Sequence, residues 1–121
     1  INGTFYGVYV NVETEDKTFL RRWFASDEGN LYEEGRADLV AGSESRWDLE
    51  TNEQANDRSG LTRFIATIDR AQDATYLADL GKSLEVPQFL RFTALEGLVN
   101  HWDMYTYTIF IINNFRLYDD P

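Results

Sequence analysis

The sequence predicts an α+β fold in which an antiparallel sheet element is followed by a helical bundle and a returning strand. Three observations favour this fold class. Residues 4–13 are β-branched and aromatic and alternate between two faces, as in a strand. Three stretches between residues 57 and 102 space their apolar residues as helices do. Residues 106–112 and 114–118 are again rich in Ile, Phe and Tyr, which are typical of strands.

The first predicted strand, residues 4–13, has one face that carries unusual residues. Gly7 lies inside the strand, where a glycine permits close approach by a ligand or by another backbone. The alternative is that Gly7 only marks a bulge. Glu13 ends the same face and is either a functional carboxylate or a solvated strand end.

A short core helix is predicted next, because Glu15 and Asp16 suit the positive end of a helix dipole. Residues 27–30 read as a turn, and Leu31-Tyr32 starts a second strand. Residues 33–56 carry weak signals and predict a long irregular segment with a possible strand at 45–49. The apolar stripe of the short helix consists of Phe19, Leu20, Trp23 and Phe24.

Three further helices are expected to pack together. Asp57 is a plausible N-cap for the first. The second runs from about Asp73 to Gly81, and the third begins at Pro87, which a first helical turn tolerates. The apolar stripes are Leu61, Phe64, Ile65 and Ile68 in the first helix, Tyr76, Leu77 and Leu80 in the second, and Phe92, Leu95, Val99 and Trp102 in the third.

Composition places the chain among globular proteins. With 121 residues, 43% hydrophobic and 15% aromatic, it has enough sequence for a single core. Its net charge of −10 argues against nucleic-acid binding, which needs clustered Lys and Arg. The acidity serves solubility, or alternatively recruits basic substrates. The sequence contains no membrane-span-like apolar run, and one His with no Cys makes a zinc site improbable.

The strongest candidate for chemistry is Asp103, which closes Asn100-His101-Trp102-Asp103 where a helix gives way to a strand. Irregular positions held by rigid elements are where catalytic residues concentrate. A carboxylate beside Trp102 and Tyr105 can be both desolvated and oriented, as a general base requires. The alternative is a capping or loop carboxylate.

Four stretches, in order over nearly the whole chain, resemble the CotH family of spore-coat proteins, whose members look like atypical secreted protein kinases. The stretches are Asn2-Gly3-Thr4-Phe5-Tyr6-Gly7-Val8-Tyr9-Val10-Asn11-Val12-Glu13 with Asp16-Lys17-Thr18-Phe19-Leu20; Gly29-Asn30-Leu31-Tyr32 with Trp47-Asp48-Leu49-Glu50-Thr51-Asn52; Phe89-Leu90-Arg91-Phe92 through Asn100-His101-Trp102-Asp103; and Asn114-Phe115-Arg116-Leu117-Tyr118.

The resemblance implies a part of an atypical kinase-like fold that uses ATP and Mg²⁺ or Mn²⁺ to phosphorylate Ser or Thr of surface, coat or extracellular proteins. It implies a location outside the cell or on the cell or spore surface of a bacterium. Asp103 matches the family's catalytic Asp, and Asn114, rather than Asn113, matches its metal-binding amide. Glu13 and Gly7 match the side of the site that binds the cofactor. Alternatively, Asn114 only turns the chain between strands.

The chain also departs from the family pattern. The family's domain is usually longer and includes a nucleotide-contacting lysine before the first strand and a Pro-Trp-Asp-x-Asp-like segment after the last. Residues 1–121 contain neither, so we expect a single partial domain, an internal piece that is inactive alone. Glu50 also stands where family members often carry Lys, which puts activity in doubt.

Two other functions remain open on the sequence alone. The main rival is a non-catalytic structural or binding module of a coat or extracellular assembly. A hydrolase that pairs Glu13 with Asp103 is more distant, since no sequence spacing fixes their separation. Residues 108–112 form an uncharged, β-prone run, and such a run predicts self-association through the C-terminal strand.

Overall fold

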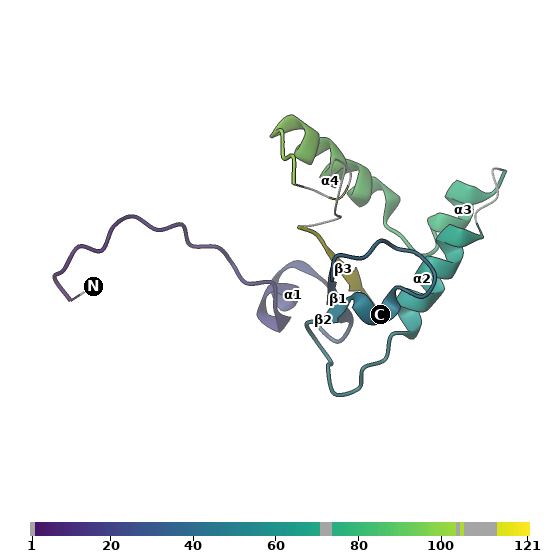
Figure 1. The fold of residues 1–121 in the computed structure, drawn as a ribbon, viewed down its shortest axis with the longest axis horizontal. Coiled ribbons are helices and arrows are strands. Elements are labelled where there is room, and N and C mark those ends of the chain that lie inside the picture. The colour runs from purple at the N-terminus through teal and green to yellow at the C-terminus, as the bar shows by residue number, and fades with distance from the viewer. Residues whose placement is uncertain (1, 71–73, 104, 106–113) are drawn as a thin grey trace.

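The computed structural model describes residues 2–70, 74–103, 105 and 114–121 (Figure 1). Within these residues it contains four α-helices, one 3-10 helix and a three-stranded antiparallel sheet, which confirms the α+β class. The elements are α1 (Lys17–Trp23), β1 (Asn30–Glu33), η1 (Glu44–Arg46), β2 (Asp48–Leu49), α2 (Ser59–Asp69), α3 (Tyr76–Leu80), α4 (Val86–Leu98) and β3 (Arg116–Asp119).

The sheet has the strand order β2-β1-β3, so the last strand of the chain returns to pair with the first. Tyr32 of β1 lies opposite Leu49 on one side and Leu117 on the other. The predicted returning strand is therefore confirmed. Because β3 pairs with β1 in the antiparallel sense, the residues directly before β3 lie beside the segment that follows β1.

The core lies where α2 covers the sheet. Trp47 and Tyr32 are almost fully buried, and Leu61 and Ile65 of α2 complete the cluster. These two α2 residues belong to the predicted apolar stripe, which is confirmed. The N-cap residue of α2 is Arg58 rather than the predicted Asp57, although the Asp57 carboxylate accepts a hydrogen bond from the Ser59 backbone N–H at 2.9 Å and so supports the first turn.

The short helix α1 is also confirmed, and it is tied to the sheet. Asp16 caps it by accepting hydrogen bonds from the backbone N–H groups of Thr18 and Phe19 at 2.7 and 3.0 Å. Arg116 of β3 lies 2.9 Å from Glu33 and 3.3 Å from Glu15, which directly precedes that cap. One guanidinium thus joins the start of α1 to the two longer strands.

The predicted strand over residues 4–13 is wrong for this structure. The segment is extended and exposed, with Val8 94% exposed, and it projects from the folded part (Figure 1). A strand is held by hydrogen bonds to a neighbouring strand, and the described residues supply no such neighbour for it. Strand-like composition alone is therefore insufficient to form the element.

The predicted packing of three helices is only partly correct. Helices α2 and α3 lie side by side, whereas α4 stands apart from them (Figure 1). Leu95 and Trp102 of the predicted α4 stripe are 59% and 73% exposed. Part of the reason for the exposure of Trp102 is that α4 ends at Leu98, so Val99 and Trp102 do not continue the face of the helix. The predicted strand at 106–112, with its self-association segment, lies outside the described residues.

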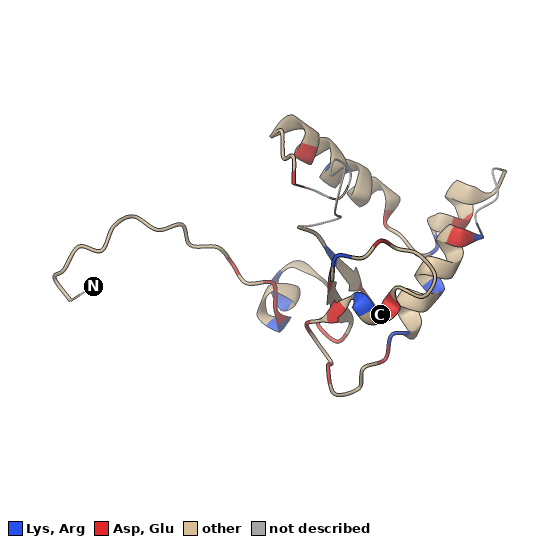
Figure 2. Cartoon of the chain, viewed as in Figure 1, with Lys and Arg blue, Asp and Glu red and all other residues tan. Residues whose placement is uncertain are grey.

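Charge is spread over the folded part of the chain. Figure 2 shows Lys and Arg interspersed with Asp and Glu, and the described residues 2–12 carry no charge. No described helix is long and apolar enough to cross a membrane.

Candidate functional site

Asp103 and Asn114 are placed by two irregular segments that flank helix α4 and strand β3. Beyond α4, the chain turns at Asn100, whose φ of +53° is tolerated by asparagine better than by most residues. The backbone N–H of His101 then donates to the Glu96 carbonyl at 3.0 Å. Asn114, with φ of +55°, makes a similar turn shortly before β3.

The structure brings these two predicted residues into direct contact. The Asn114 side-chain Nδ2 donates to the Asp103 backbone carbonyl at 2.8 Å and to its carboxylate Oδ2 at 2.7 Å. Two bonds from one amide fix both the main chain and the side chain of Asp103. The Asn114 backbone N–H donates to Glu34 Oε1 at 3.3 Å, which adds an anchor next to β1.

An aromatic chain supports this pair from the core side. Tyr105, two residues after Asp103, has its ring centroid 4.7 Å from that of Phe115, the residue after Asn114. Phe115 in turn lies 5.4 Å from buried Trp47, and Tyr105 lies 6.1 Å from Phe89 of α4. Burial raises the pKa of the Tyr105 hydroxyl, which agrees with its position against apolar neighbours. Tyr105 packs against Phe89 and Phe115, whereas Trp102 is exposed, so the aromatic wall beside the Asp103 carboxylate stays a prediction.

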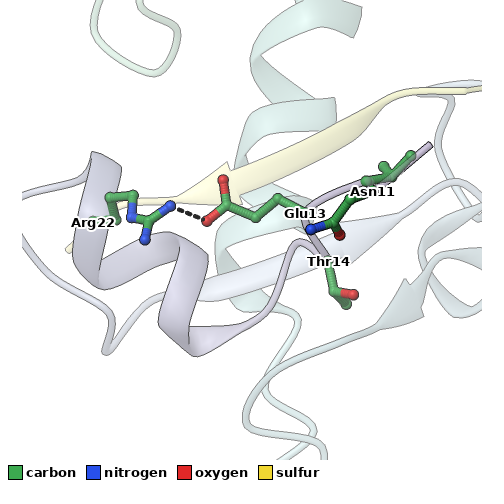
Figure 3. Close-up of a pocket in the computed structure, with 5 residues that line it drawn as sticks. Asn11, Glu13, Thr14 and Arg22 are labelled. Carbon is green, nitrogen blue, oxygen red and sulfur yellow. Dashed lines mark hydrogen bonds and ion pairs between the residues drawn. The ribbon is translucent and has the colours of Figure 1, made fainter. Parts of the chain in front are cut away.

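Glu13 contacts helix α1. Its carboxylate lies 2.8 Å from Arg22 and accepts a hydrogen bond from the Trp23 indole at 3.4 Å. It lines an open, shallow cavity of about 390 Å³ together with Asn11, Val12, Thr14 and Arg22 (Figure 3). The ion pair of Glu13 with Arg22 spans this cavity, so a cation already faces the carboxylate.

Gly7 lies in the exposed N-terminal segment. Its φ of +115° is in the region that favours glycine, and the atoms nearest to an added Cβ belong to the Tyr9 side chain, at 3.7 Å or more. The structure therefore gives Gly7 a conformational reason to be glycine. The described contacts of Gly7 and Glu13 do not bring them to the Asp103–Asn114 pair.

Glu50, the departure from the family pattern, is exposed at the end of β2. Its backbone N–H donates to the Leu31 carbonyl at 2.9 Å. Partial burial, with the nearby Glu33 carboxylate as the next cause, raises the pKa of its carboxyl group. The surroundings of Glu50 are thus acidic. Asn113, the weaker candidate for the metal-binding amide, lies outside the described residues.

The two parts of the second stretch of the family resemblance join β1 to the chain after β2. Thr51 Oγ1 accepts from the Leu31 N–H at 2.9 Å and donates to the Gly29 carbonyl at 3.0 Å. The Asn52 side-chain amide donates to the Gly29 carbonyl and to Asn30 Oδ1, both at 3.0 Å. These residues therefore hold the sheet together rather than line the candidate site.

Sequence reasoning missed three residues near the site: Glu34, Phe115 and Glu96. Glu34 and Phe115 become neighbours of the pair only through β1–β3 pairing, which no local pattern specifies. Glu96 did carry a signal, because it lies four residues after Phe92 and three before Val99. A charged residue thus stands within an apolar stripe.

The pair offers oxygen ligands of the kind that Mg²⁺ prefers. The described residues contain no group of three or more His, Cys, Asp and Glu that could hold a metal ion. However, Mg²⁺ usually keeps several waters and takes only one or two protein carboxylates alongside substrate phosphates. With Nδ2 of Asn114 bound to Asp103, its Oδ1 accepts no hydrogen bond among the described residues. The donor set therefore fits such an ion, although it does not form a complete cage.

The comparisons identify a family for the chain. The family model for CotH kinase protein matches residues 1–121, which is the whole chain. No match was found among curated proteins or among solved structures. Because the match covers every residue, this chain belongs to the CotH kinase protein family.

Proposed function

We propose that this chain is a portion of a CotH-like protein kinase domain that transfers phosphate from ATP to Ser or Thr of a protein. The single observation that carries the proposal is the double hydrogen bond from the Asn114 amide to Asp103. Phosphoryl transfer needs a carboxylate that orients the acceptor hydroxyl and an amide oxygen close to a divalent metal ion. The family match independently favours this reaction class.

In the proposed site, Asp103 would accept a hydrogen bond from the acceptor hydroxyl and would receive its proton as the hydroxyl oxygen bonds to the γ-phosphorus of ATP and ADP leaves. The Asn114 Nδ2 is suited to hold Asp103 in one orientation, and its Oδ1 would be the ligand available to Mg²⁺ or Mn²⁺. The ion, when bound, would neutralise charge on the ATP phosphates. Tyr105, two residues after Asp103, packs against Phe115 and so ties the segment that carries Asp103 to the core.

Glu13 and Gly7 are proposed for the side of the domain that binds ATP. Glu13 already pairs with a cation, Arg22, which is the behaviour expected of a carboxylate that orients a cation toward phosphate. Gly7 leaves its backbone open to close approach. We propose that these residues meet Asp103 only in a longer domain, for which the chain supplies a part.

The protein substrate is proposed to be a surface, coat or extracellular protein, and the enzyme to act on the cell or spore surface of a bacterium. This part of the proposal rests on the family alone. The net charge of −10 is compatible with a protein substrate and disfavours nucleic acid.

The test is a phosphate-transfer assay on the full-length protein that contains this sequence, with labelled ATP and Mg²⁺ or Mn²⁺. We expect transfer to Ser or Thr of a co-incubated surface protein or of the enzyme itself. The 121-residue chain alone is the matched comparison and should transfer nothing. Transfer by the short chain would refute the partial-domain proposal, and absence of transfer by the full-length protein would refute the kinase proposal.

A second candidate, a non-catalytic structural or binding module, is favoured by one observation. Glu50 stands at the position where family members often carry Lys, and a carboxylate at that position would repel phosphate, whereas a lysine would attract it. Glu50→Lys separates the two functions. A kinase weakened by Glu50 should gain turnover in this variant, whereas a binding module should show no phosphate transfer with either residue.

A further inference from the structure

Helix α4 buries a single residue, and that residue is a glutamate. Glu96 is 6% exposed, whereas its apolar neighbours Leu95 and Leu98 are 59% and 83% exposed. Burial of a carboxylate costs free energy unless it is paired. A carboxylate in the last turn of a helix is also disfavoured by the helix dipole. The local packing therefore maintains a costly arrangement at this position.

The partner of Glu96 is His101, in the loop that leads to Asp103. Glu96 Oε1 lies 3.5 Å from His101 Nδ1, which is an ion pair whenever the imidazole is protonated. The Glu96 carbonyl also accepts the His101 backbone N–H at 3.0 Å. The other carboxylate oxygen, Oε2, is buried and has no hydrogen-bond partner among the described residues.

We propose that Glu96 is a positioning residue that holds His101 and so fixes the loop that presents Asp103. Glu96 contacts residue 101 through both its main chain and its side chain, and Asp103 follows only two residues later. Asn114 restrains Asp103 from the β3 side, and Glu96 restrains the same loop from the α4 side. The catalytic part of this inference rests on the proposed kinase function.

The first test compares Glu96→Gln with Glu85→Gln in the full-length protein. Gln keeps the size of the side chain but removes the charge, and Glu85 is an exposed glutamate that precedes the same helix. For Glu96→Gln we expect kcat to fall about tenfold, the effect of losing one charge-assisted contact, with KM for ATP unchanged. Glu85→Gln should match the wild type.

A double-mutant cycle shows whether Glu96 acts through His101. If it does, His101→Ala should lower kcat to a similar extent, and combining it with Glu96→Gln should add nothing further. Additive losses, or a rise in KM for ATP in place of the fall in kcat, would overturn the positioning role.

The second test needs no activity. Amide hydrogen exchange of residues 99–103, in the same full-length variants, should become about tenfold faster in Glu96→Gln, while exchange in β1 stays the same. If the wild-type protein proves inactive, the kinase proposal fails but exchange still decides whether Glu96 holds the loop. Unchanged exchange in residues 99–103 would overturn the inference in either case.

Discussion

The rings of Tyr105 and Phe115 lie 4.7 Å apart, and they immediately adjoin the segments that carry Asp103 and Asn114. The ring contact and the amide-to-carboxylate contact therefore bridge the same two segments, one on the core side and one at the surface. Phe115 packs in turn against Trp47, so the candidate site is anchored to the largest fully buried side chain among the described residues.

Phe115→Ala should loosen the candidate site together with the fold. Because Phe115 is only partly buried, we expect a loss of about 2 kcal/mol in the free energy of unfolding, roughly half the value for a fully buried Phe. Turnover of the full-length protein should fall at temperatures where the variant remains folded. Phe5→Ala is the control, because Phe5 is 84% exposed. Denaturant unfolding and phosphate transfer, measured on both, check this; equal stability of the two variants would contradict it.

The helices that the sequence predicted well are those whose apolar stripe is buried against other described residues. Leu61 and Ile65 on α2 are the clearest example, and Leu20 on α1 is another. The strand at residues 4–13 failed because pairing, not composition, makes a strand. The α4 stripe failed because apolar spacing predicts a face but does not specify what covers it.

Thr51→Val should destabilise the sheet although it barely changes side-chain shape. Thr51 Oγ1 is buried and bonds both the Leu31 N–H and the Gly29 carbonyl. The Leu31 N–H would lose this acceptor, which costs about 1–3 kcal/mol. Thr62→Val on the exposed face of α2 is the matched control and should be close to neutral. A thermal unfolding series that places both variants at the wild-type midpoint would count against this role for Thr51.

Gly29→Ala and Gly97→Ala should have opposite effects. A Cβ on Gly29 would overlap the Asp119 carbonyl oxygen and the Tyr118 ring, so the β1–β3 pair must shift, at about 1–3 kcal/mol. A Cβ on Gly97, in α4, meets nothing within 4 Å, and alanine there should stabilise the helix by about 0.5–1 kcal/mol. Chemical denaturation of both variants checks the signs, and a stabilised Gly29→Ala protein would show that β3 is not packed as described.

Acid should weaken the cap of α1. Hydrogen bonds from the Phe19 and Thr18 backbone N–H groups hold the pKa of Asp16 below its ordinary value of 3.8. A depressed folded-state pKa means that the stabilisation is complete above the unfolded-state pKa and is lost as pH falls through the folded-state pKa. Asp16→Asn keeps a good cap without titrating. The stability of Asp16→Asn should therefore fall less than that of the wild type between about pH 7 and about pH 3. Circular dichroism melts measure this difference. Identical losses would show that Asp16 does not contribute to the loss of stability in acid.

The candidate site was only partly predictable. Asp103 and Asn114 could each be selected by residue type and by resemblance, but their eleven-residue separation does not bring them together by itself. Their contact depends on β3 returning to β1 and on positive φ at Asn100 and Asn114. Glu34 enters the site through that same pairing.

Asp103→Asn in the full-length protein is the decisive variant for the proposed reaction. The substitution is nearly isosteric, and an amide oxygen at this position can still accept a hydrogen bond from Asn114, so the fold and ATP binding should persist. The charge that accepts the hydroxyl proton is lost, and turnover should fall by about 10²–10⁴-fold. Asp69→Asn, an exposed aspartate at the end of α2, is the control and should keep full turnover.

A loop or capping carboxylate would behave differently, because Asn replaces Asp in caps at little cost. Melting temperature and steady-state phosphate transfer, measured together on Asp103→Asn and Asp69→Asn, separate the two roles. If a folded Asp103→Asn protein kept wild-type turnover, the contact between Asn114 and Asp103 would have only a structural role, connecting the segment after α4 to the segment before β3. The kinase proposal would then lose the observation that carries it.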